Sequence, residues 1–447
     1  MADAQSPTQE KKFTRVNALQ TYISLMTYTF DILSFVAISF VIVPVSHAIY
    51  PSKTVGISLL VTWGGFAAGS VTRPLGAAII GPLYDKVGRK RGLYLSIAGS
   101  SLLTAAIAAN PTYASVGIWA PTIFIALRLI GGIFIGALIS GGLVFAPENL
   151  PERFRGLMTG FAEAGGSWAH VIGAAWLLMI TAVFVGTAYF SVGWRVMFLV
   201  ALLPLILIIP VLYKIPESQI YVKAKSKGKT QKGVYKTLFS RSTGMRNAFL
   251  IAVFSSIGLL GYDNLTENTF PTFLAEVNKV APGNIATLVL IGAAFGVIGS
   301  IAGGAISQKT GRKPFAIGGG IILIVISVLF LYLGGLPGTD YYPILFAIAP
   351  FYFFASISKA DLSVFLNEAF TTEVRSTAVG LNWNLGYGIA GVWPLITSAA
   401  IAVYGLKVYP MAQFIALAVL GIVYLIASVV SKETIGNISR EEASMAS

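Results

Sequence analysis

Acidic side chains lie inside apolar stretches of the sequence, where an ionised carboxylate is costly. Asp31 lies near the middle of the first stretch, and the spacing of four between Asp263 and Glu267 sets both on one helical face. Burial raises a carboxyl pKa and a nearby cation lowers it, so such a group can take up and release a proton. We therefore predict proton coupling, with Asp31 the first candidate, Asp263 and Glu267 next, and Glu163 last. A carboxyl that only hydrogen-bonds to a neighbouring helix is the competing interpretation.

Three cations also lie inside apolar stretches. A guanidinium binds a carboxylate through two parallel hydrogen bonds, so we expect Arg128 to receive a substrate carboxylate. Arg73 lies about 18 Å from the next charged loop at 1.5 Å per residue. It should therefore face a cavity or an acid such as Asp31. Lys359 either neutralises Asp361, two residues away, or joins it in binding substrate.

Aromatic and amide side chains near these charges complete the expected substrate site. They are Tyr28, Tyr262, Asn382, Asn384 and Tyr387, and for the two amides hydrogen bonding between helices is an equal alternative. The chain has no cysteine and two histidines, so we expect no metal centre. No Walker-type phosphate loop is present, so the expected energy source is a proton gradient, with no cofactor.

The elements that position these residues are predicted to be membrane-spanning helices. The chain is 55% hydrophobic and 11% charged, whereas about 25% is charged in ordinary soluble domains. Its apolar runs are near the length of about 20 residues that crosses a bilayer. We expect an all-α integral membrane protein with twelve spans, at residues 20–45, 55–81, 92–110, 115–146, 157–188, 194–214, 246–274, 284–307, 314–335, 341–366, 376–402 and 408–431.

The distribution of lysine and arginine predicts the orientation of these spans. With a cytoplasmic N-terminus, the outside loops hold only Lys53, Arg195, Lys279 and Lys407 of the 31 cations. Cytoplasmic loops of membrane proteins carry an excess of such residues. Both termini are therefore expected in the cytoplasm, without a cleavable signal peptide, in a cell membrane. The net charge of +13 then reflects topology, and no nucleic-acid partner is expected.

The two halves of the sequence repeat a charged pattern. GPLYDKVGRKR (Gly81–Arg91) returns as GAISQKTGRKP (Gly304–Pro314), and the second copy has glutamine where the first has Asp85. Such a repeat predicts two pseudo-symmetric six-helix bundles. We expect a tail at 1–19, bundles at 20–214 and 246–431 joined by a basic linker at 215–245, and a second tail at 432–447.

The repeated charged residues are expected to form gates between the two bundles. We expect Asp85 to accept from the N-terminus of a neighbouring helix, that of the eleventh span, or to pair with a local arginine. A latch of this kind would favour the outward-open state, and its counterpart at Gln308 should be weaker because it lacks the charge. The expected gating residues are Asp85, Arg89, Glu148 and Arg155 with their counterparts Gln308, Arg312, Glu368 and Arg375.

The loop at Gly81–Arg91 and the segment RLIGGIFIG (Arg128–Gly136) resemble signature motifs of the major facilitator superfamily. Glu148–Gly166, Gly193–Ser218 and NTFPTFL are similar to the proton-coupled carboxylate symporters. These include the sialate and lactate permeases, with aromatic-acid and metabolite symporters nearby. Before PTFL, lactate permeases carry a histidine and a Gln-Asp pair, whereas this chain has Asn264–Asn268. The resemblance also implies another role for Arg128, which is holding backbone carbonyls of the first span or transferring protons.

These observations predict a monomeric proton-coupled symporter that imports a small organic anion, a mono-, sugar or aromatic carboxylate, by alternating access. A proton-coupled sugar porter is the first alternative, suggested by the PES sequence at 216–218 and by Glu-x(6)-Arg-Gly from Glu148. A transporter-like nutrient sensor is an alternative of another class, but it usually needs a longer cytoplasmic tail. We expect that the protein is not an enzyme, because the sequence shows no nucleophile–base or metal constellation.

Overall fold

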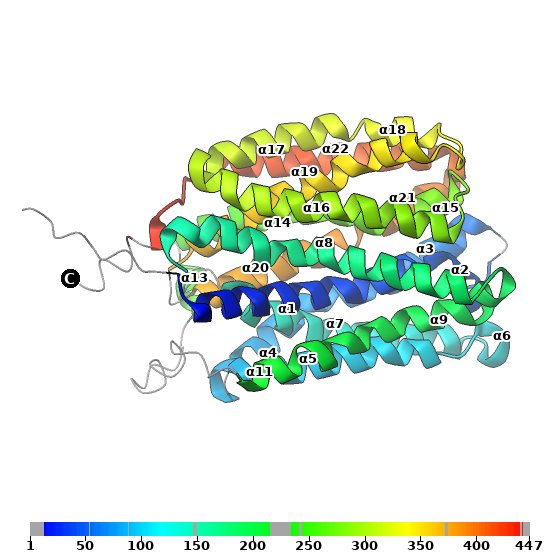
Figure 1. Ribbon diagram of the computed structural model, residues 1–447, viewed down its shortest axis with the longest axis horizontal. Coiled ribbons are helices and arrows are strands. Elements are labelled where there is room, and N and C mark those ends of the chain that lie inside the picture. The colour runs from blue at the N-terminus through cyan, green and yellow to red at the C-terminus, as the bar shows by residue number, and fades with distance from the viewer. Residues whose placement is uncertain are drawn as a thin grey trace, which may run out of the picture.

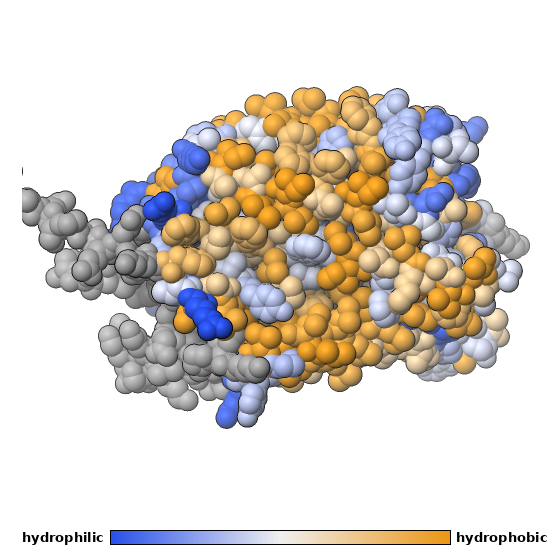
Figure 2. All heavy atoms as spheres, in the orientation of Figure 1, coloured by the Kyte–Doolittle hydropathy of each residue, from blue (hydrophilic) through white to orange (hydrophobic). Residues whose placement is uncertain are grey.

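The structure is a computed structural model that describes residues 13–52, 54–87, 89–145, 150–214, 234–240, 244–371, 374–438 and 440. Over these residues it is a bundle of long helices without a strand (Figure 1). Twelve of the described helices are long and apolar enough to cross a membrane, which confirms the predicted fold class. On the face shown in Figure 2, apolar side chains cover the middle and polar ones gather toward both ends, as a bilayer requires.

The first six spans run from residue 15 to residue 214. The helix α1 starts earlier than predicted because Thr14 and Asn17 form a capping box, in which Thr14 Oγ1 accepts from the Asn17 N–H at 3.3 Å. It ends before Pro44, which has no N–H to offer the Phe40 carbonyl. The elements are α1 (Arg15–Ser39), α2 (Ile42–Ile49), α3 (Val55–Val71), α4 (Arg73–Val87), α5 (Arg89–Ala106), η1 (Ile107–Ala109), α6 (Tyr113–Val116), α7 (Trp119–Phe145), α8 (Glu152–Val183), η2 (Tyr189–Gly193), α9 (Trp194–Met197), η3 (Phe198–Leu202), α10 (Leu203–Leu207) and α11 (Ile209–Lys214).

The last six spans follow the short helix α13 (Val234–Leu238). The seventh span changes from an α-helix to a π-helical turn at η4, and this turn holds Glu267. The elements are α14 (Met245–Asp263), η4 (Asn264–Asn268), α15 (Phe270–Glu276), α16 (Pro282–Thr310), α17 (Arg312–Ile326), α18 (Leu329–Gly334), α19 (Tyr341–Ala369), α20 (Arg375–Ala390), α21 (Trp393–Tyr404), η5 (Leu406–Val408) and α22 (Tyr409–Val430).

The start of α1, the helix α13 and the described C-terminal residues lie at one end of the bundle, here called the linker end (Figure 1). The opposite end, which holds α6, is called the far end. The charge distribution predicts that the linker end faces the cytoplasm.

The two six-helix bundles touch closely at the linker end, where α8 of the first crosses α16 of the second. A Cβ on Gly156 would lie 2.3 Å from the Gly304 carbonyl oxygen, and one on Gly304 would lie 2.2 Å from that of Gly156. Only glycine allows this approach of two backbones. The Gly156 N–H also donates to the Gln308 side chain at 3.1 Å, so a side-chain hydrogen bond joins the bundles here.

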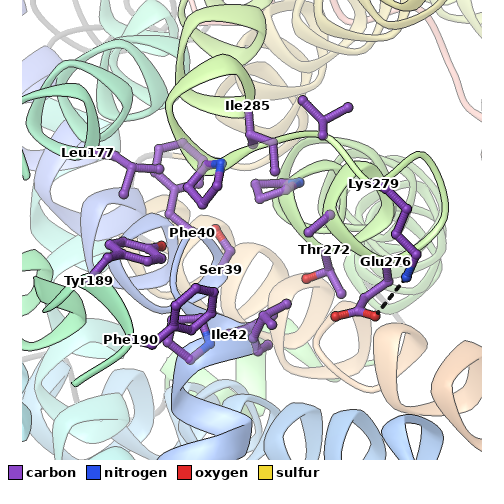
Figure 3. Close-up of a pocket in the computed structure, with 16 residues that line it drawn as sticks. Ser39, Phe40, Ile42, Leu177, Tyr189, Phe190, Thr272, Glu276, Lys279 and Ile285 are labelled. Atoms are coloured by element: carbon purple, nitrogen blue, oxygen red, sulfur yellow. Dashed lines mark ion pairs between the residues drawn. The ribbon is translucent and has the colours of Figure 1, made fainter. Parts of the chain in front are cut away.

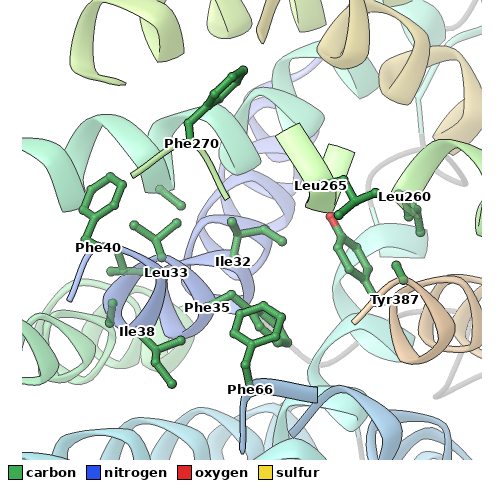
Figure 4. Packing of buried hydrophobic residues seen from close by; sticks show 14 of the residues in the cluster. Ile32, Leu33, Phe35, Ile38, Phe40, Phe66, Leu260, Leu265, Phe270 and Tyr387 are labelled. Carbon is green, nitrogen blue, oxygen red and sulfur yellow. The ribbon is translucent and has the colours of Figure 1, made fainter. Parts of the chain in front are cut away.

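An aromatic core lies between the bundles at mid-depth. The ring of Phe35 in α1 lies 5.2 Å from that of Phe66 in α3 and stacks on Tyr387 of α20 at 6.3 Å (Figure 4). All three side chains are buried. Because Tyr387 belongs to the second bundle, the two bundles are also in contact at this aromatic core. The charged residues described next lie beside it.

Candidate functional site

The first charged pair lies at the centre of the molecule. Arg73, the first residue of α4, places Nη2 2.9 Å from Asp31 Oδ2, and both side chains are fully buried. Its Nε donates to Asn384 Oδ1 of α20 at 3.0 Å, and its guanidinium lies 4.8 Å from the Tyr387 ring centre. Asp31 is thus the acid that Arg73 meets, as the sequence suggested. The pair joins α1, α4 and α20, so it spans both bundles.

The second charged cluster belongs to the C-terminal bundle. Lys359 of α19 places Nζ 2.6 Å from Asp263 Oδ1 and 4.0 Å from Glu267 Oε2, and all three side chains are buried. The interpretation that Lys359 neutralises Asp361 is wrong. Residues two apart on a helix point to different faces, since each residue adds about 100° of rotation. Asp361 instead faces a small pocket that Arg312 also lines.

Two phenols connect these charged groups. The Tyr387 hydroxyl donates to Asp263 Oδ2 at 3.3 Å. The Tyr28 hydroxyl of α1 lies 3.1 Å from the Tyr387 hydroxyl, and its ring centre lies 5.9 Å from Lys359 Nζ. A continuous polar network therefore runs from the first bundle to the second.

Glu163 lies near this network without joining it. The side chain is fully buried in α8, and neither carboxylate oxygen has a hydrogen-bond partner, although the Ser363 hydroxyl is close. Lys359, Asp263 and Asp31 are near enough to act on it electrostatically. These neighbours belong to the central network, so Glu163 lies with it and not at the linker-end mouth. A buried carboxyl without a partner costs least when it carries a proton.

Arg128 of α7 is a buried cation with no acidic partner among the described side chains. One guanidinium nitrogen lies 3.5 Å from the Ser34 carbonyl oxygen of α1, and Nε and Nη2 have no partner. The guanidinium lies 5.3 Å from the Phe35 ring centre and 5.7 Å from that of Phe66. The long bond to Ser34 agrees with the role that the family resemblance implies, and it leaves two donors for an anion.

His170 was not among the predicted site residues, yet it lies in this network. Its Nδ1 is 3.3 Å from Glu267 Oε2 and 3.1 Å from the Gly166 carbonyl oxygen. On the other side of Glu267, the Ser356 hydroxyl donates to Oε1 at 3.4 Å. A single histidine has no spacing pattern, but it was the only histidine inside a predicted span, and that could have drawn attention to it.

Three predicted site residues have no described bond to the network. The Tyr262 hydroxyl donates to the Leu323 carbonyl of α17 at 2.8 Å, and Asn382 Nδ2 donates to the Ala378 carbonyl of its own helix at 2.8 Å. Asp361 faces the pocket of Arg312. We therefore drop all three as substrate ligands. Their neighbours Asp263 and Trp383 face the centre, since adjacent helical residues diverge by about 100°.

Three of the predicted gating residues of the second bundle, Gln308, Arg312 and Glu368, form a cluster at the linker end, in which Arg312 and Glu368 are buried. Arg312 binds both Glu368 oxygens, with Nε at 3.1 Å and Nη2 at 3.2 Å, and its Nη2 donates to Gln308 at 2.7 Å. Because Gln308 also accepts from Gly156, this cluster is tied to the first bundle. Glu148 and the side chains of Asp85 and Arg89 lie outside the described residues.

Two further gating candidates make matching bonds in the two bundles. Arg155 donates to the Leu150 carbonyl at 3.2 Å, and Arg375 donates to the Phe370 carbonyl at 3.1 Å. In each case the acceptor lies five residues before the arginine. The shared geometry agrees with the sequence repeat.

Glu433, which follows the last span, caps the N-terminus of α17. Its carboxylate accepts from the backbone N–H groups of Arg312 at 3.0 Å and Lys313 at 3.1 Å. The N–H groups of Thr434 and Ile435 add bonds of 2.9 and 3.0 Å. Partial burial would raise the pKa of Glu433, but these four donors outweigh it and hold the pKa below its usual value.

We expect replacement of Glu433 by glutamine to lower the melting temperature of the purified protein by a few degrees at neutral pH. A carboxylate whose folded pKa is lowered stabilises the fold above its unfolded pKa of about 4.3, and this contribution is lost as pH falls through the folded pKa. The difference from wild type should therefore shrink below about pH 4. Thermal unfolding from pH 3 to 8 measures it, and a pH-independent difference would contradict the capping role.

Comparisons with known proteins agree with the twelve-span helical fold described above. The family model of the Major Facilitator Superfamily matches residues 24–394. The chain belongs to this superfamily. A solved structure of the proton:xylose symporter XylE, bound to 6-bromo-6-deoxy-D-glucose, has a TM-score of 0.75 over 95% of this chain and 98% of that one, at 16% identity. At that identity the likeness shows the fold.

Curated relatives in the superfamily are transporters of several substrate types. The inner membrane metabolite transport protein YhjE of Escherichia coli is 26% identical, over 91% of this chain and 93% of its own. The proline/betaine transporter of Salmonella typhimurium is 25% identical over 88% and 79%. The citrate-proton symporter of Klebsiella pneumoniae is 25% identical over 82% and 81%. The predicted kinship with sialate and lactate permeases is not found among these relatives and stays a prediction.

Proposed function

We propose that this chain is a proton-coupled symporter that imports a small organic anion by alternating access. One observation carries the proposal. Beside the buried network, one cation, Arg128, and one carboxyl, Glu163, have no partner of opposite charge among the described residues. An anion and a proton are the two species that would satisfy them.

The charges of the network explain why both species would move together. Asp31 already pairs with Arg73, and Asp263 with Lys359, so neither cation is left for a substrate. A carboxylate on Arg128 adds a negative charge to a buried region. A proton on Glu163 removes a negative charge from the same region. This balance matters because charges interact strongly at low dielectric. The doubly loaded state therefore carries the same net charge as the empty one, whereas binding of either species alone changes the buried charge by one unit, which favours the movement of proton and anion as a unit.

A zwitterionic solute is a second candidate, favoured by the aromatic side chains beside Asp263. The Tyr28 and Trp383 rings lie 5.7 Å apart edge to face, and Trp383 lies 6.0 Å from Tyr387. Such rings attract a quaternary ammonium, while Arg128 could take the carboxylate. The relatives named for citrate and for proline and betaine represent the two candidate classes. A neutral sugar would leave Arg128 unsatisfied, which weighs against the sugar alternative.

Uptake into proteoliposomes with an imposed pH gradient tests this function. The panel consists of radiolabelled lactate, citrate, benzoate, glycine betaine and xylose. We expect accumulation of at least one carboxylate when the outside is acidic, and its loss when an uncoupler collapses the gradient. Accumulation of xylose alone would contradict the proposal and support the sugar alternative.

Replacing Arg128 with glutamine should raise the half-saturation concentration for the transported carboxylate by about a hundredfold. The reason is the loss of charge-assisted hydrogen bonds, worth about 2–3 kcal/mol. Arg195 provides the control, since it also donates to a backbone carbonyl, that of Ala108 at 2.8 Å, but at the far end. Uptake kinetics of Arg128→Gln and Arg195→Gln show whether Arg128 binds the substrate carboxylate. Equal affinity of Arg128→Gln and wild type would remove Arg128 from substrate binding.

A further inference from the structure

A cavity of about 210 Å³ opens at the far end, between the two bundles (Figure 3). The first bundle contributes Phe40 and Leu177 to its wall, and the second contributes Thr272. Glu276 and the exposed Lys279 lie 3.7 Å apart among its lining residues. The charge distribution of the sequence predicts that this end faces the outside, where an inward proton gradient supplies protons.

A row of buried polar groups leads from this cavity toward Glu267. Thr272 lines the cavity, Asn268 precedes it by four residues, and Asn268 lies beside the His170 ring. Thr272 Oγ1, Asn268 Oδ1 and His170 Nε2 are buried without hydrogen-bond partners. Glu267 Oε2 is also unpaired, so unpaired polar atoms are found from the cavity wall to this carboxyl. Buried polar atoms in native proteins are normally paired, and these have hydrogen-bonding capacity left for a proton path.

The contacts of His170 fix which ring nitrogen holds the proton. Nδ1 makes its hydrogen bond to the Gly166 carbonyl oxygen at 3.1 Å, and Glu267 Oε2, an acceptor without a hydrogen-bond partner, lies 3.3 Å from it. It must therefore carry the hydrogen. Nε2 then presents a lone pair, and no described donor occupies it. The ring edge also packs against Phe40, whose centroid is 6.5 Å away and which lines the cavity.

We propose that His170 relays the coupling proton from the far-end cavity to Glu267, an inference that rests on the proposed symport function. A proton from cavity water bonds to the Nε2 lone pair. The N–H bond at Nδ1 then breaks, and that proton bonds to Glu267 Oε2. The imidazole is neutral again with its hydrogen on Nε2, and Glu267 has become neutral. From Glu267 the proton passes to Glu163, which has the same charged neighbours, Lys359 and Asp263. Tautomer exchange through the reopened cavity restores the starting state.

The charged groups around the relay favour passing the proton onward. Lys359 and Asp263 contact Glu267 from α19 and α14, Glu163 lies on the same helix as His170, and the Tyr352 ring of α19 lies 5.9 Å from the imidazole. Burial disfavours a charged imidazolium and Lys359 repels it, while Asp263 offsets part of this effect. The imidazole can therefore pass the charge on but not keep it, which is what a relay requires.

The chain holds only two histidines, so His47 in α2, which is exposed, provides a matched control. Glutamine at 170 keeps a hydrogen-bonding group but cannot bind and release a proton. We expect His170→Gln to lower the ratio of gradient-driven uptake to solute exchange at equal pH at least tenfold, and His47→Gln to leave it unchanged. The solute is whichever panel compound wild-type liposomes accumulate.

Chemical rescue separates a relay from a merely structural role. In His170→Ala liposomes, imidazole added outside should restore part of the gradient-driven uptake, while the same concentration added only inside should not. Full uptake by His170→Gln with an unchanged pH profile, or absence of rescue by external imidazole, would overturn the relay and leave the symport function standing. If wild-type protein accumulates no panel solute, the proposed function fails and the relay fails with it.

Discussion

Glu163→Gln should abolish accumulation driven by a proton gradient while solute exchange at equal pH continues. Glutamine has the size of a protonated glutamate and mimics its neutral state permanently, so the carrier can still load and reorient without releasing a proton. The amide oxygen of glutamine can still accept from the nearby Ser363 hydroxyl, so the substitution should disturb the surrounding contacts little. We expect the ratio of accumulated to external solute to fall to about one.

The control for this experiment is Glu152→Gln, at the first position of the same helix α8. Glu152 lies on the surface, so its neutralisation should leave accumulation unchanged. Stability gives an independent readout. Removing an unpaired buried carboxyl should hold or raise the melting temperature of Glu163→Gln. Undiminished accumulation by this variant would exclude Glu163 as the proton carrier.

The spans could be predicted from the sequence because membrane insertion depends on length and hydropathy, which are local properties. Boundaries were harder to predict. The first span ends at Ser39, where the missing N–H of Pro44 interrupts the helix, although apolar residues continue past this point. The depth of Arg73 in the membrane was also predictable from its distance to the charged loop. At that depth its side chain had to contact an acid or a cavity, and it contacts Asp31.

The partners within the site could not be predicted as fully, because they depend on how helices rotate and pack. Lys359 and Asp361 are close in sequence but on different helical faces, so Lys359 pairs with Asp263, 96 residues away. Tyr262 was expected beside Asp263, yet its hydroxyl bonds to Leu323. His170 joins Glu267 only because α8 and the π-helical turn η4 meet. No local pattern contains these contacts.

Asp31→Asn should lower the free energy of unfolding by about 3–5 kcal/mol, because it leaves the fully buried Arg73 without its counter-charge. Thermal unfolding of the purified protein measures this. Asp340, at the N-terminus of α19 and without a side-chain cap bond, provides the control substitution. We expect the double variant Asp31→Asn/Arg73→Met to recover most of the loss, because it removes the uncompensated charge as well.

Comparison of the single and double variants also decides what Asp31 does during transport. If Asp31 is an ionised anchor for Arg73, the single variant is unstable and the double variant regains both stability and gradient-driven uptake, with Glu163 holding the proton. If Asp31 itself carries the proton, it is neutral for part of the cycle, so asparagine costs little stability. In that case the double variant, though folded, still fails to accumulate solute. The two roles thus predict opposite combinations of stability and coupling.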